Sequence, residues 1–445
     1  MRQKTAREVA LGALLSMEEK EGYSNLVLAG ALEAAQLSQR DASLASTLFY
    51  GVLERKLTLD WYLQSCLRDP KKKLDPIARM ALRCGAYQIF YLSRIPDSAA
   101  VNETVSAVRS FGRAELCGFV NGVLRSLLRQ KDALSLPTGD SPEEWSIRYS
   151  VPVGLIGLWN KAYGKEITQK LLASFEERAG LDVRVNRARV TQEALRERLG
   201  ARGIELIPYE TPAFAARLSN CGSPAALPEF AEGLFHVQDL SAQLACAILD
   251  PKEGQTVVDC CAAPGGKTFT MAQQVGESGQ VHAFDLYENR VGLIRDGASR
   301  LGLTNITACA ADMTQPQEQP VLADRVLCDA PCSGFGVIRR KPEIRYKDLD
   351  ETKALPDLQF AILENAAGFT APGGVLVYST CTLNPRENGK VAERFLQAHE
   401  DFAPQRIELP GVTRVLDEPE HHLTMMPFSG ASDGFFAAAF VRKTD

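Results

Sequence analysis

One stretch in the second half of the chain limits the possible folds more than any other. Residues 256–268 read Thr-Val-Val-Asp-Cys-Cys-Ala-Ala-Pro-Gly-Gly-Lys-Thr. The β-branched start predicts a buried strand, and Gly265 and Gly266 permit a tight turn because they carry no Cβ. A helix follows, and its amide end faces the turn, as in a cofactor-binding corner. A P-loop also ends in Gly-Lys-Thr, but Cys261 occupies the position of its first glycine, which excludes that motif.

Strand-like runs recur after this corner at helix-length intervals. They lie at 281–285, 305–312, 325–332, 373–381 and 434–443. Strands that alternate with helices predict a parallel, doubly wound sheet of the α/β Rossmann-like class. Ligands bind such sheets at the carboxyl ends of the strands. The acids at those ends are Asp259, Asp285, Asp312 and Asp329. Asp285 lies about 20 residues beyond the glycines, where an acceptor for ribose hydroxyls is expected.

Length and composition predict a globular protein with several domains. A chain of 445 residues predicts about three domains, and 45% hydrophobic residues suffice for compact cores. We find no apolar run long enough to cross a bilayer and no signal peptide, so we expect a cytoplasmic protein without membrane contact. The eleven cysteines show no CxxC pair and no zinc spacing, which predicts reduced thiols and no metal site. We also expect a monomer.

Three domains are predicted along the chain. Residues 1–133 have apolar residues at helical spacing and no strand alternation, which predicts an all-α domain. Residues 134–142 are polar and rich in turn formers, so they predict a linker. Residues 143–235 combine short helices with two strand-like runs, which predicts a small α+β domain similar to an RNA-recognition fold. Residues 236–445 contain the corner and the doubly wound sheet.

The charge distribution is uneven. The net charge is −5, yet residues 1–135 contain 19 Lys and Arg against 14 Asp and Glu. Basic runs that could contact RNA phosphates lie at Lys71–Lys73, at Arg125, Arg129 and Lys131, and at Arg184, Arg187 and Arg189. The alternative interpretation of any such run is an ordinary solvated face.

Two cysteines and an acid follow neighbouring strand-like runs. Asp329 and Cys332 belong to Asp-Ala-Pro-Cys-Ser-Gly, and Cys381 to Ser-Thr-Cys-Thr. This set suits attack on a pyrimidine, because a thiolate that adds to carbon 6 of cytosine makes carbon 5 nucleophilic. An acid beside the base can hold nitrogen 3 and the amino group as charge builds in the ring. Spacing and chemistry leave open which thiol adds and which assists its release.

The same residues carry a family resemblance. Residues 260–268, 329–334 and 379–382 resemble the motifs of RNA cytosine-5 methyltransferases. Within the first 130 residues, segments such as 49–55 and 119–125 resemble the helical RNA-binding domain of NusB-type antitermination factors. Together, the chain resembles bacterial 16S ribosomal RNA cytosine-5 methyltransferases of the Sun/Fmu type.

This resemblance implies a cofactor, a substrate and a set of roles. The cofactor is S-adenosylmethionine and the substrate is 16S ribosomal RNA. Cys381 is the nucleophile, Cys332 assists its release, and Asp329 holds the base. The residues implied for cofactor binding are Cys261, Ala262, Ala263, Pro264, Gly265, Gly266, Lys267, Asp285, Asp312 and Asp329.

The chain departs from the family pattern at two places, and two alternative functions remain. Cys260 stands where an apolar residue is usual, and residues 339–346 are a variant of the family's basic segment. One alternative is a tRNA cytosine-5 methyltransferase, which the catalytic motifs permit. The other is a non-catalytic RNA-binding transcription or assembly factor. The intact Cys332, Cys381 and Asp329 argue against that second alternative.

Overall fold

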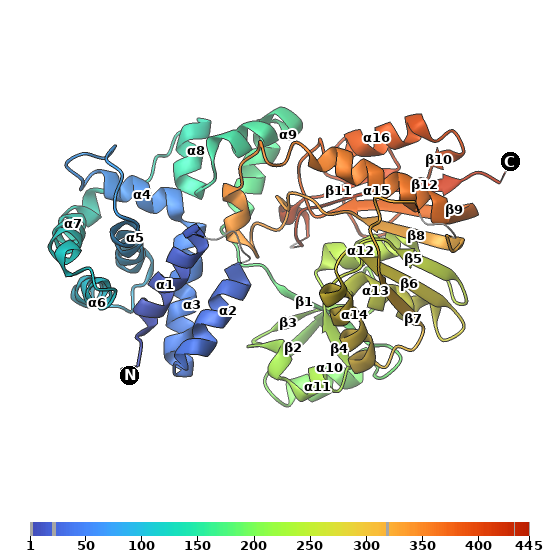
Figure 1. Ribbon diagram of the computed structural model, residues 1–445, viewed down its shortest axis with the longest axis horizontal. Coiled ribbons are helices and arrows are strands. Elements are labelled where there is room, and N and C mark those ends of the chain that lie inside the picture. The colour runs from blue at the N-terminus through green and yellow to red at the C-terminus, as the bar shows by residue number, and fades with distance from the viewer. Residues whose placement is uncertain (1–2, 20–23, 317–319, 431, 445) are drawn as a thin grey trace. The chain divides into compact units, whose positions relative to one another are not determined.

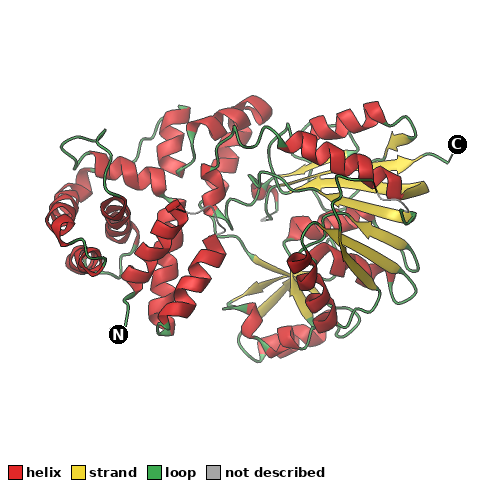
Figure 2. Ribbon diagram, viewed as in Figure 1, coloured by secondary structure: helices red, strands yellow, loops and turns green. Residues whose placement is uncertain are grey.

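The computed structural model describes residues 3–19, 24–316, 320–430 and 432–444 (Figure 1). The chain forms two compact units. The first contains Met1–Glu176 together with Arg340–Lys347, and the second contains Glu177–Arg339 and Asp348–Asp445. Among the residues that the structure describes, all strands belong to the second unit (Figure 2). No described helix is long and apolar enough to cross a membrane.

The first unit is helical, as the sequence predicts for residues 1–133. Its helices are α1 (Ala6–Glu19), α2 (Ser24–Ala35), α3 (Gln39–Glu54), α4 (Lys56–Gln64), α5 (Pro76–Tyr91), α6 (Asp97–Ser110), α7 (Cys117–Gln130), α8 (Pro142–Tyr149) and α9 (Val153–Ser174). Helix α5 lies at the centre and buries Ala81, Leu82 and Ala86 completely. Asp75 caps this helix by accepting from the Ile77 amide at 2.9 Å.

Helices α8 and α9 belong to the first unit, although the sequence places the start of the next domain at residue 143. The polar stretch 134–142 ends in a capping box in which Ser141 and Glu144 satisfy each other's backbone amides. Helix α8 then packs against α4, where the Thr58 hydroxyl donates to the Ile147 carbonyl at 2.5 Å. The linker-like composition of residues 134–142 therefore marks a turn within the first unit, because the helices after it still pack against the helices before it.

Residues 340–347 also belong to the first unit, far from its other residues in sequence. Arg345 is buried and donates to the Glu54 carbonyl at 2.9 Å and the Tyr149 carbonyl at 3.3 Å. The Tyr346 hydroxyl donates to the Leu53 carbonyl at 2.9 Å. The departure from the family's basic segment thus includes side chains that hold α3 and α8 together.

A four-stranded antiparallel sheet forms the smaller part of the second unit. Its order is β2-β3-β1-β4, and the strands are β1 (Leu181–Val185), β2 (Glu205–Pro208), β3 (Ala215–Ser219) and β4 (Phe235–Val237). Helices α10 (Gln192–Gly200) and α11 (Pro228–Ala231) accompany it. The two expected strands are β1 and β2. Strand β4 has only three residues, and β3 reads Ala-Ala-Arg-Leu-Ser, in which two adjacent small residues and Arg217 leave no alternation in sequence.

The larger sheet has eight strands and follows the expected Rossmann-like plan. Its order is β10-β12-β9-β8-β5-β6-β7, and β11 pairs with β12. The strands are β5 (Thr256–Asp259), β6 (Gln280–Asp285), β7 (Ile306–Ala310), β8 (Ala323–Asp329), β9 (Thr370–Thr380), β10 (Phe402–Pro404), β11 (His422–Met425) and β12 (Phe435–Arg442). Strands β5 to β9 are parallel, as expected. Strand β12 is antiparallel to β9, which corrects the prediction of a fully parallel sheet, because burial patterns carry no information on strand direction.

Helices cover both faces of this sheet. They are α12 (Leu240–Leu249), α13 (Gly266–Val275), α14 (Glu288–Leu301), α15 (Leu355–Phe369) and α16 (Gly389–Ala398). Val257 packs with α12 and α13, whereas its neighbour Val258 packs with α15 and α16. This alternation follows from the two-residue period of a strand. Because helices cover both faces, the carboxyl edge of the sheet is where a site can form.

Candidate active site

The cofactor corner has the geometry that the glycines predict. Strand β5 ends at Asp259, and Gly265 adopts φ +109° just before α13 begins. A Cβ at Gly265 would lie 2.3 Å from the Phe269 ring, so both the backbone angle and the space demand glycine. The turn therefore presents the amide end of α13 toward the carboxyl edge of the sheet.

A cleft of about 110 Å³ opens at this corner. It is lined by Gln238, Ala242, Asp259, Cys261, Ala262, Pro264, Gly266, Lys267 and Asp329. Six of the residues predicted for cofactor binding are in this lining. Gln238, Ala242 and Asp259 are additional, and Gln238 carried no motif that could identify it.

Asp285 and Asp312 lie at the same edge of the sheet, on the strands beyond the corner. The buried Asp285 carboxylate accepts from the Ala263 amide at 3.2 Å and faces Arg290 at 3.3 Å. The Ala311 amide donates to the Asp285 carbonyl at 2.9 Å, which places Asp312 next to this pair. Asp312 is exposed and accepts from the Thr314 hydroxyl at 2.7 Å, and this contact lowers the pKa of Asp312.

Asp329 lies between the cofactor corner and the thiols. Its carboxylate accepts from the Lys267 ammonium at 2.6 Å and from the Ser379 hydroxyl at 2.7 Å. Burial is the largest single effect and lowers the pKa of Lys267, but the charge and the hydrogen bond of Asp329, together with the nearby Cys246 and Asp259, raise the pKa overall. Lys267 is therefore a cation at neutral pH and fixes Asp329 in place.

The two thiols meet at the ends of neighbouring strands. Strands β8 and β9 pair Asp329 with Ser379, so the residues that follow each strand emerge side by side. The sulfurs of Cys332 and Cys381 are 3.2 Å apart. A disulfide bond measures about 2.0 Å, so the sulfurs are in contact but not bonded. The hydrogen bond between the two sulfurs, in which either one can donate, and burial raise the pKa of Cys332.

Two adjacent residues that the sequence reasoning missed hold the two thiol segments. The buried Glu387 carboxylate accepts from the Ser333 amide at 2.8 Å, next to Cys332. Asn388 accepts from the Thr380 hydroxyl at 2.7 Å and donates to the Thr382 carbonyl at 2.9 Å, on both sides of Cys381. The signal that could have identified them is the polar run Asn-Pro-Arg-Glu-Asn at 384–388, shortly after the second thiol.

Not all of the predicted phosphate-binding arginines are accessible. Arg184 is 3% exposed and donates to the Ala213 carbonyl at 3.1 Å, which corrects its proposed role. Arg187 and Arg189 are exposed, and Arg189 also donates to the Arg300 carbonyl at 3.2 Å. In the first unit, Arg125 and Arg129 are likewise exposed, on α7.

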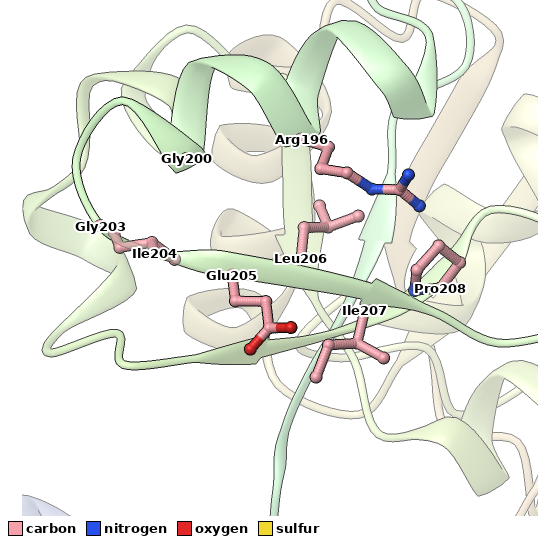
Figure 3. A pocket seen from close by; sticks show the side chains of 8 residues that line it. All are labelled: Arg196, Gly200, Gly203, Ile204, Glu205, Leu206, Ile207 and Pro208. Carbon is pink, nitrogen blue, oxygen red and sulfur yellow. The ribbon is translucent and has the colours of Figure 1, made fainter.

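A second hollow, of about 550 Å³, lies on the smaller sheet between α10 and β2 (Figure 3). Its charged lining residues are Arg196 and Glu205, and none of the predicted site residues lines it. Among the residues that the structure describes, no cluster of His, Cys, Asp or Glu could hold a metal ion.

Family models match all three parts of the chain. Residues 246–441 match "16S rRNA methyltransferase RsmB/F", residues 4–129 match "NusB family", and residues 151–222 match "Methyltr_RsmF/B-like, ferredoxin-like domain". The NusB model covers α1 to α7 and the methyltransferase model covers the Rossmann-like part, whereas the ferredoxin-like model covers β1 to β3 and also α9, which packs with the first unit.

Relatives match over the full length of the chain. The chain is 36% identical to the probable ribosomal RNA small subunit methyltransferase B of Bacillus subtilis, with 100% of both proteins covered. It is 34% identical to ribosomal RNA small subunit methyltransferase B of Vibrio cholerae, with 94% of this chain and 93% of that protein covered. Among solved structures, PH0851 has a TM-score of 0.82 and 25% identity, with 99% of both chains covered. A methyltransferase homologue from Pyrococcus horikoshii has a TM-score of 0.60 and 28% identity, over 68% of this chain and 99% of that one. The chain therefore belongs to the family of 16S ribosomal RNA methyltransferases that includes ribosomal RNA small subunit methyltransferase B.

Proposed function

We propose that this chain methylates carbon 5 of a cytosine in 16S ribosomal RNA, with S-adenosylmethionine as the methyl donor. One observation carries the proposal: the sulfurs of Cys332 and Cys381 lie 3.2 Å apart, and Asp329 precedes the first of them at the edge of the cofactor corner. Methyl transfer to a ring nitrogen or to a ribose hydroxyl requires no thiol, whereas transfer to carbon 5 requires addition at carbon 6.

Each group has a defined part in the reaction. Cys381 adds to carbon 6 as a thiolate, and Asp329 holds nitrogen 3 and the amino group while charge builds in the ring. When bound, S-adenosylmethionine supplies the methyl group that carbon 5 takes up. Cys332 then gives its proton to the departing Cys381 sulfur, and the Cys332 thiolate so formed takes the proton from carbon 5, which restores the double bond of the ring. The NusB-like helices favour ribosomal RNA over tRNA, and the exposed arginines of α7 suit contact with RNA phosphates of either kind.

Bisulfite sequencing of cellular RNA tests the target directly, because 5-methylcytosine resists conversion to uracil. We expect one or more protected cytosines in 16S RNA that disappear when the gene is deleted and return with the intact gene. Protection that disappears only from tRNA would establish the tRNA alternative. Identical profiles with and without the gene would favour the non-catalytic alternative.

Asp285→Ala is expected to weaken the binding of S-adenosylmethionine by about ten- to a hundredfold. The expected hydrogen bond from ribose to a charged acceptor contributes roughly 1.5–3 kcal/mol. Titration calorimetry on the full chain measures this loss, and Asp296→Ala on α14 removes a carboxylate outside the proposed site as a matched control. Unchanged affinity in a folded variant would remove Asp285 from the cofactor site.

The double variant Arg125→Ala/Arg129→Ala is expected to bind 16S RNA more weakly and with less dependence on salt. Each lost phosphate contact lowers the slope of log affinity against log salt by about 0.7 to 0.9, so two contacts account for about 1.4 to 1.8. Filter binding at several salt concentrations measures the slope. Lys252→Ala/Arg406→Ala removes the same charge from the second unit and is expected to leave the slope unchanged. Equal slopes for the intact chain, the α7 variant and the control variant would show that Arg125 and Arg129 do not contact RNA phosphates.

A further inference from the structure

A buried arginine beside the thiols takes no part in the proposed chemistry. The Arg339 side chain is 1% exposed, and its guanidinium lies 3.8 Å from the Asp433 carboxylate, which is 3% exposed. The same guanidinium donates to the Ser432 carbonyl. A buried ion pair stabilises a fold little compared with apolar packing, although the loss of one partner leaves an uncompensated buried charge. Stability alone is therefore a weak reason for this pair, and its surroundings provide another.

The two segments that the pair joins lie at the carboxyl edge of the larger sheet, within the second unit. Residues 333–339 follow Cys332 directly. Residues 432–434 lead into β12, which pairs with β9 up to the residue before Cys381. Each segment is thus a neighbour of one thiol, and the ion pair connects the two segments.

Backbone hydrogen bonds connect both segments to the nucleophile. The Gly434 amide donates to the Gly336 carbonyl at 2.9 Å, and the Gly336 amide donates to the Cys381 carbonyl at 3.0 Å. A Cβ at Gly336 would lie 1.9 Å from the Gly434 oxygen and 2.8 Å from the Cys381 oxygen, so the three backbones touch without space for a side chain. A shift of residues 432–434 therefore displaces Gly336, and with it the backbone of Cys381.

The ion pair holds this contact at a second point. Arg339 lies three residues after Gly336, and Asp433 lies one residue before Gly434. The ion pair and the glycine hydrogen bond therefore fix both the separation of the two segments and their relative rotation. The Asp433 amide also donates to the Asp239 carboxylate at 3.4 Å, at the start of α12, so the pair is anchored to a helix on the sheet.

We propose that Arg339 and Asp433 are positioning residues for the nucleophile: they maintain the contact between Gly336 and Gly434, which sets the place of the Cys381 backbone and thereby of its sulfur. This inference rests on the proposed function, because it requires a reaction through Cys381. Neither side chain lines the cofactor cleft. A displacement of about 1 Å suffices for a hundredfold loss in rate, so a change in this contact is measurable.

Single-turnover methylation of 16S RNA by the full chain tests the proposal. We expect Arg339→Ala and Asp433→Ala to lower the rate constant about a hundredfold and to leave the dissociation constants of RNA and S-adenosylmethionine unchanged. Arg339→Lys keeps a cation within reach of Asp433 and should recover most of the lost rate. Bisulfite sequencing of the RNA at successive times measures the rate, and titration of each ligand measures its affinity.

The covalent adduct shows which step is slowed. In a chain that also carries Cys332→Ala, the adduct with RNA accumulates, so its rate of appearance reports the attack of Cys381. Arg339→Ala in that chain should slow the appearance of the adduct by the same factor as methylation, about a hundredfold. An adduct that forms as fast with Arg339→Ala as without it would overturn the positioning of the nucleophile.

Arg442→Ala is the matched control, because it removes similar contacts at the opposite end of β12. Arg442 lies 3.2 Å from the Asp401 carboxylate and donates to the Thr370 carbonyl at 2.8 Å. Its loss should lower the stability in urea and leave the single-turnover rate of the folded protein unchanged. An equal fall in rate for Arg442→Ala and Arg339→Ala would show a general effect of stability and overturn the inference.

The remaining outcomes separate this inference from the proposed function. An intact chain that forms no 5-methylcytosine overturns both. An intact chain that methylates, with alanine variants that are equally fast or that lose only affinity for RNA or cofactor, overturns the inference alone. If the alanine variants do not fold, Asp433→Asn and Arg339→Lys decide: Asp433→Asn keeps the shape without the charge, and a rate equal to that of Arg339→Lys and of the intact chain would refute the part of the ion pair.

Discussion

Cys381→Ala is expected to abolish methylation, whereas Cys332→Ala is expected to leave the protein covalently attached to its RNA. Without Cys381 there is no nucleophile, so neither product nor adduct forms. Without Cys332 the nucleophile still adds and the methyl group is transferred, but the donor 3.2 Å from the Cys381 sulfur is missing. Release then slows and the adduct accumulates. Denaturing electrophoresis of each variant with labelled 16S RNA and S-adenosylmethionine resolves the two failures.

The contact of 3.2 Å between the two sulfurs supports a step in which one thiol assists the release of the other, and the family resemblance assigns the attack to Cys381. Cys309→Ala, which removes a thiol from β7, is the matched control and should methylate normally. An adduct from Cys381→Ala but none from Cys332→Ala would reverse the roles. Full methylation by both variants would refute the mechanism through a cysteine adduct.

Glu387→Ala is expected to lower the free energy of unfolding by about 3 kcal/mol and to reduce methylation about a hundredfold. The carboxylate satisfies three buried donors: the Ser333 amide, the Gln359 side chain at 3.0 Å and the Asn384 side chain at 2.8 Å. Each unpaired buried donor costs roughly 1–3 kcal/mol, and part of this is recovered by relaxation. Displacement of Cys332 by about 1 Å suffices for a hundredfold loss in rate. Urea unfolding and single-turnover methylation measure the two effects.

Two further variants show whether the effect of Glu387 depends on the shape of its side chain or on its charge. Glu387→Gln keeps the shape but places an amide donor against other donors, so we expect an intermediate loss of both stability and rate. Glu393→Ala removes an exposed carboxylate from α16 and should change neither quantity. If Glu387→Ala were as stable and as active as the intact chain, the hydrogen bonds that hold the Cys332 segment would be dispensable.

The cofactor corner and the strand ends were predictable because residues close together in sequence determine their structure. A β-branched run, two glycines and an acid define a strand, a turn and an edge within about 30 residues of sequence. The parallel order of β5 to β9 follows from helix-length spacing in the same way. The identity of the nucleophile did not follow from spacing and required the family resemblance.

Features that depend on distant partners were not predictable. Arg184 appears in sequence as part of a basic run, and only the packing of β1 shows that its side chain is buried. The direction of β12 depends on which strand it joins, and Glu387 gains its role only when the chain returns to Cys332. In each case the local pattern fits several environments equally well, and long-range contact selects one.

The return of residues 340–347 to the first unit has a consequence for synthesis of the chain. At about 5–20 residues per second, a ribosome needs roughly 8–30 s to proceed from residue 176 to residue 340. Throughout that interval the Glu54 and Tyr149 carbonyls lack the guanidinium that they meet in the finished protein. The nascent helical unit stays incomplete while the smaller sheet and four strands of the larger sheet are translated, and ribosome pausing within this window would lengthen the exposure of its unpaired carbonyls.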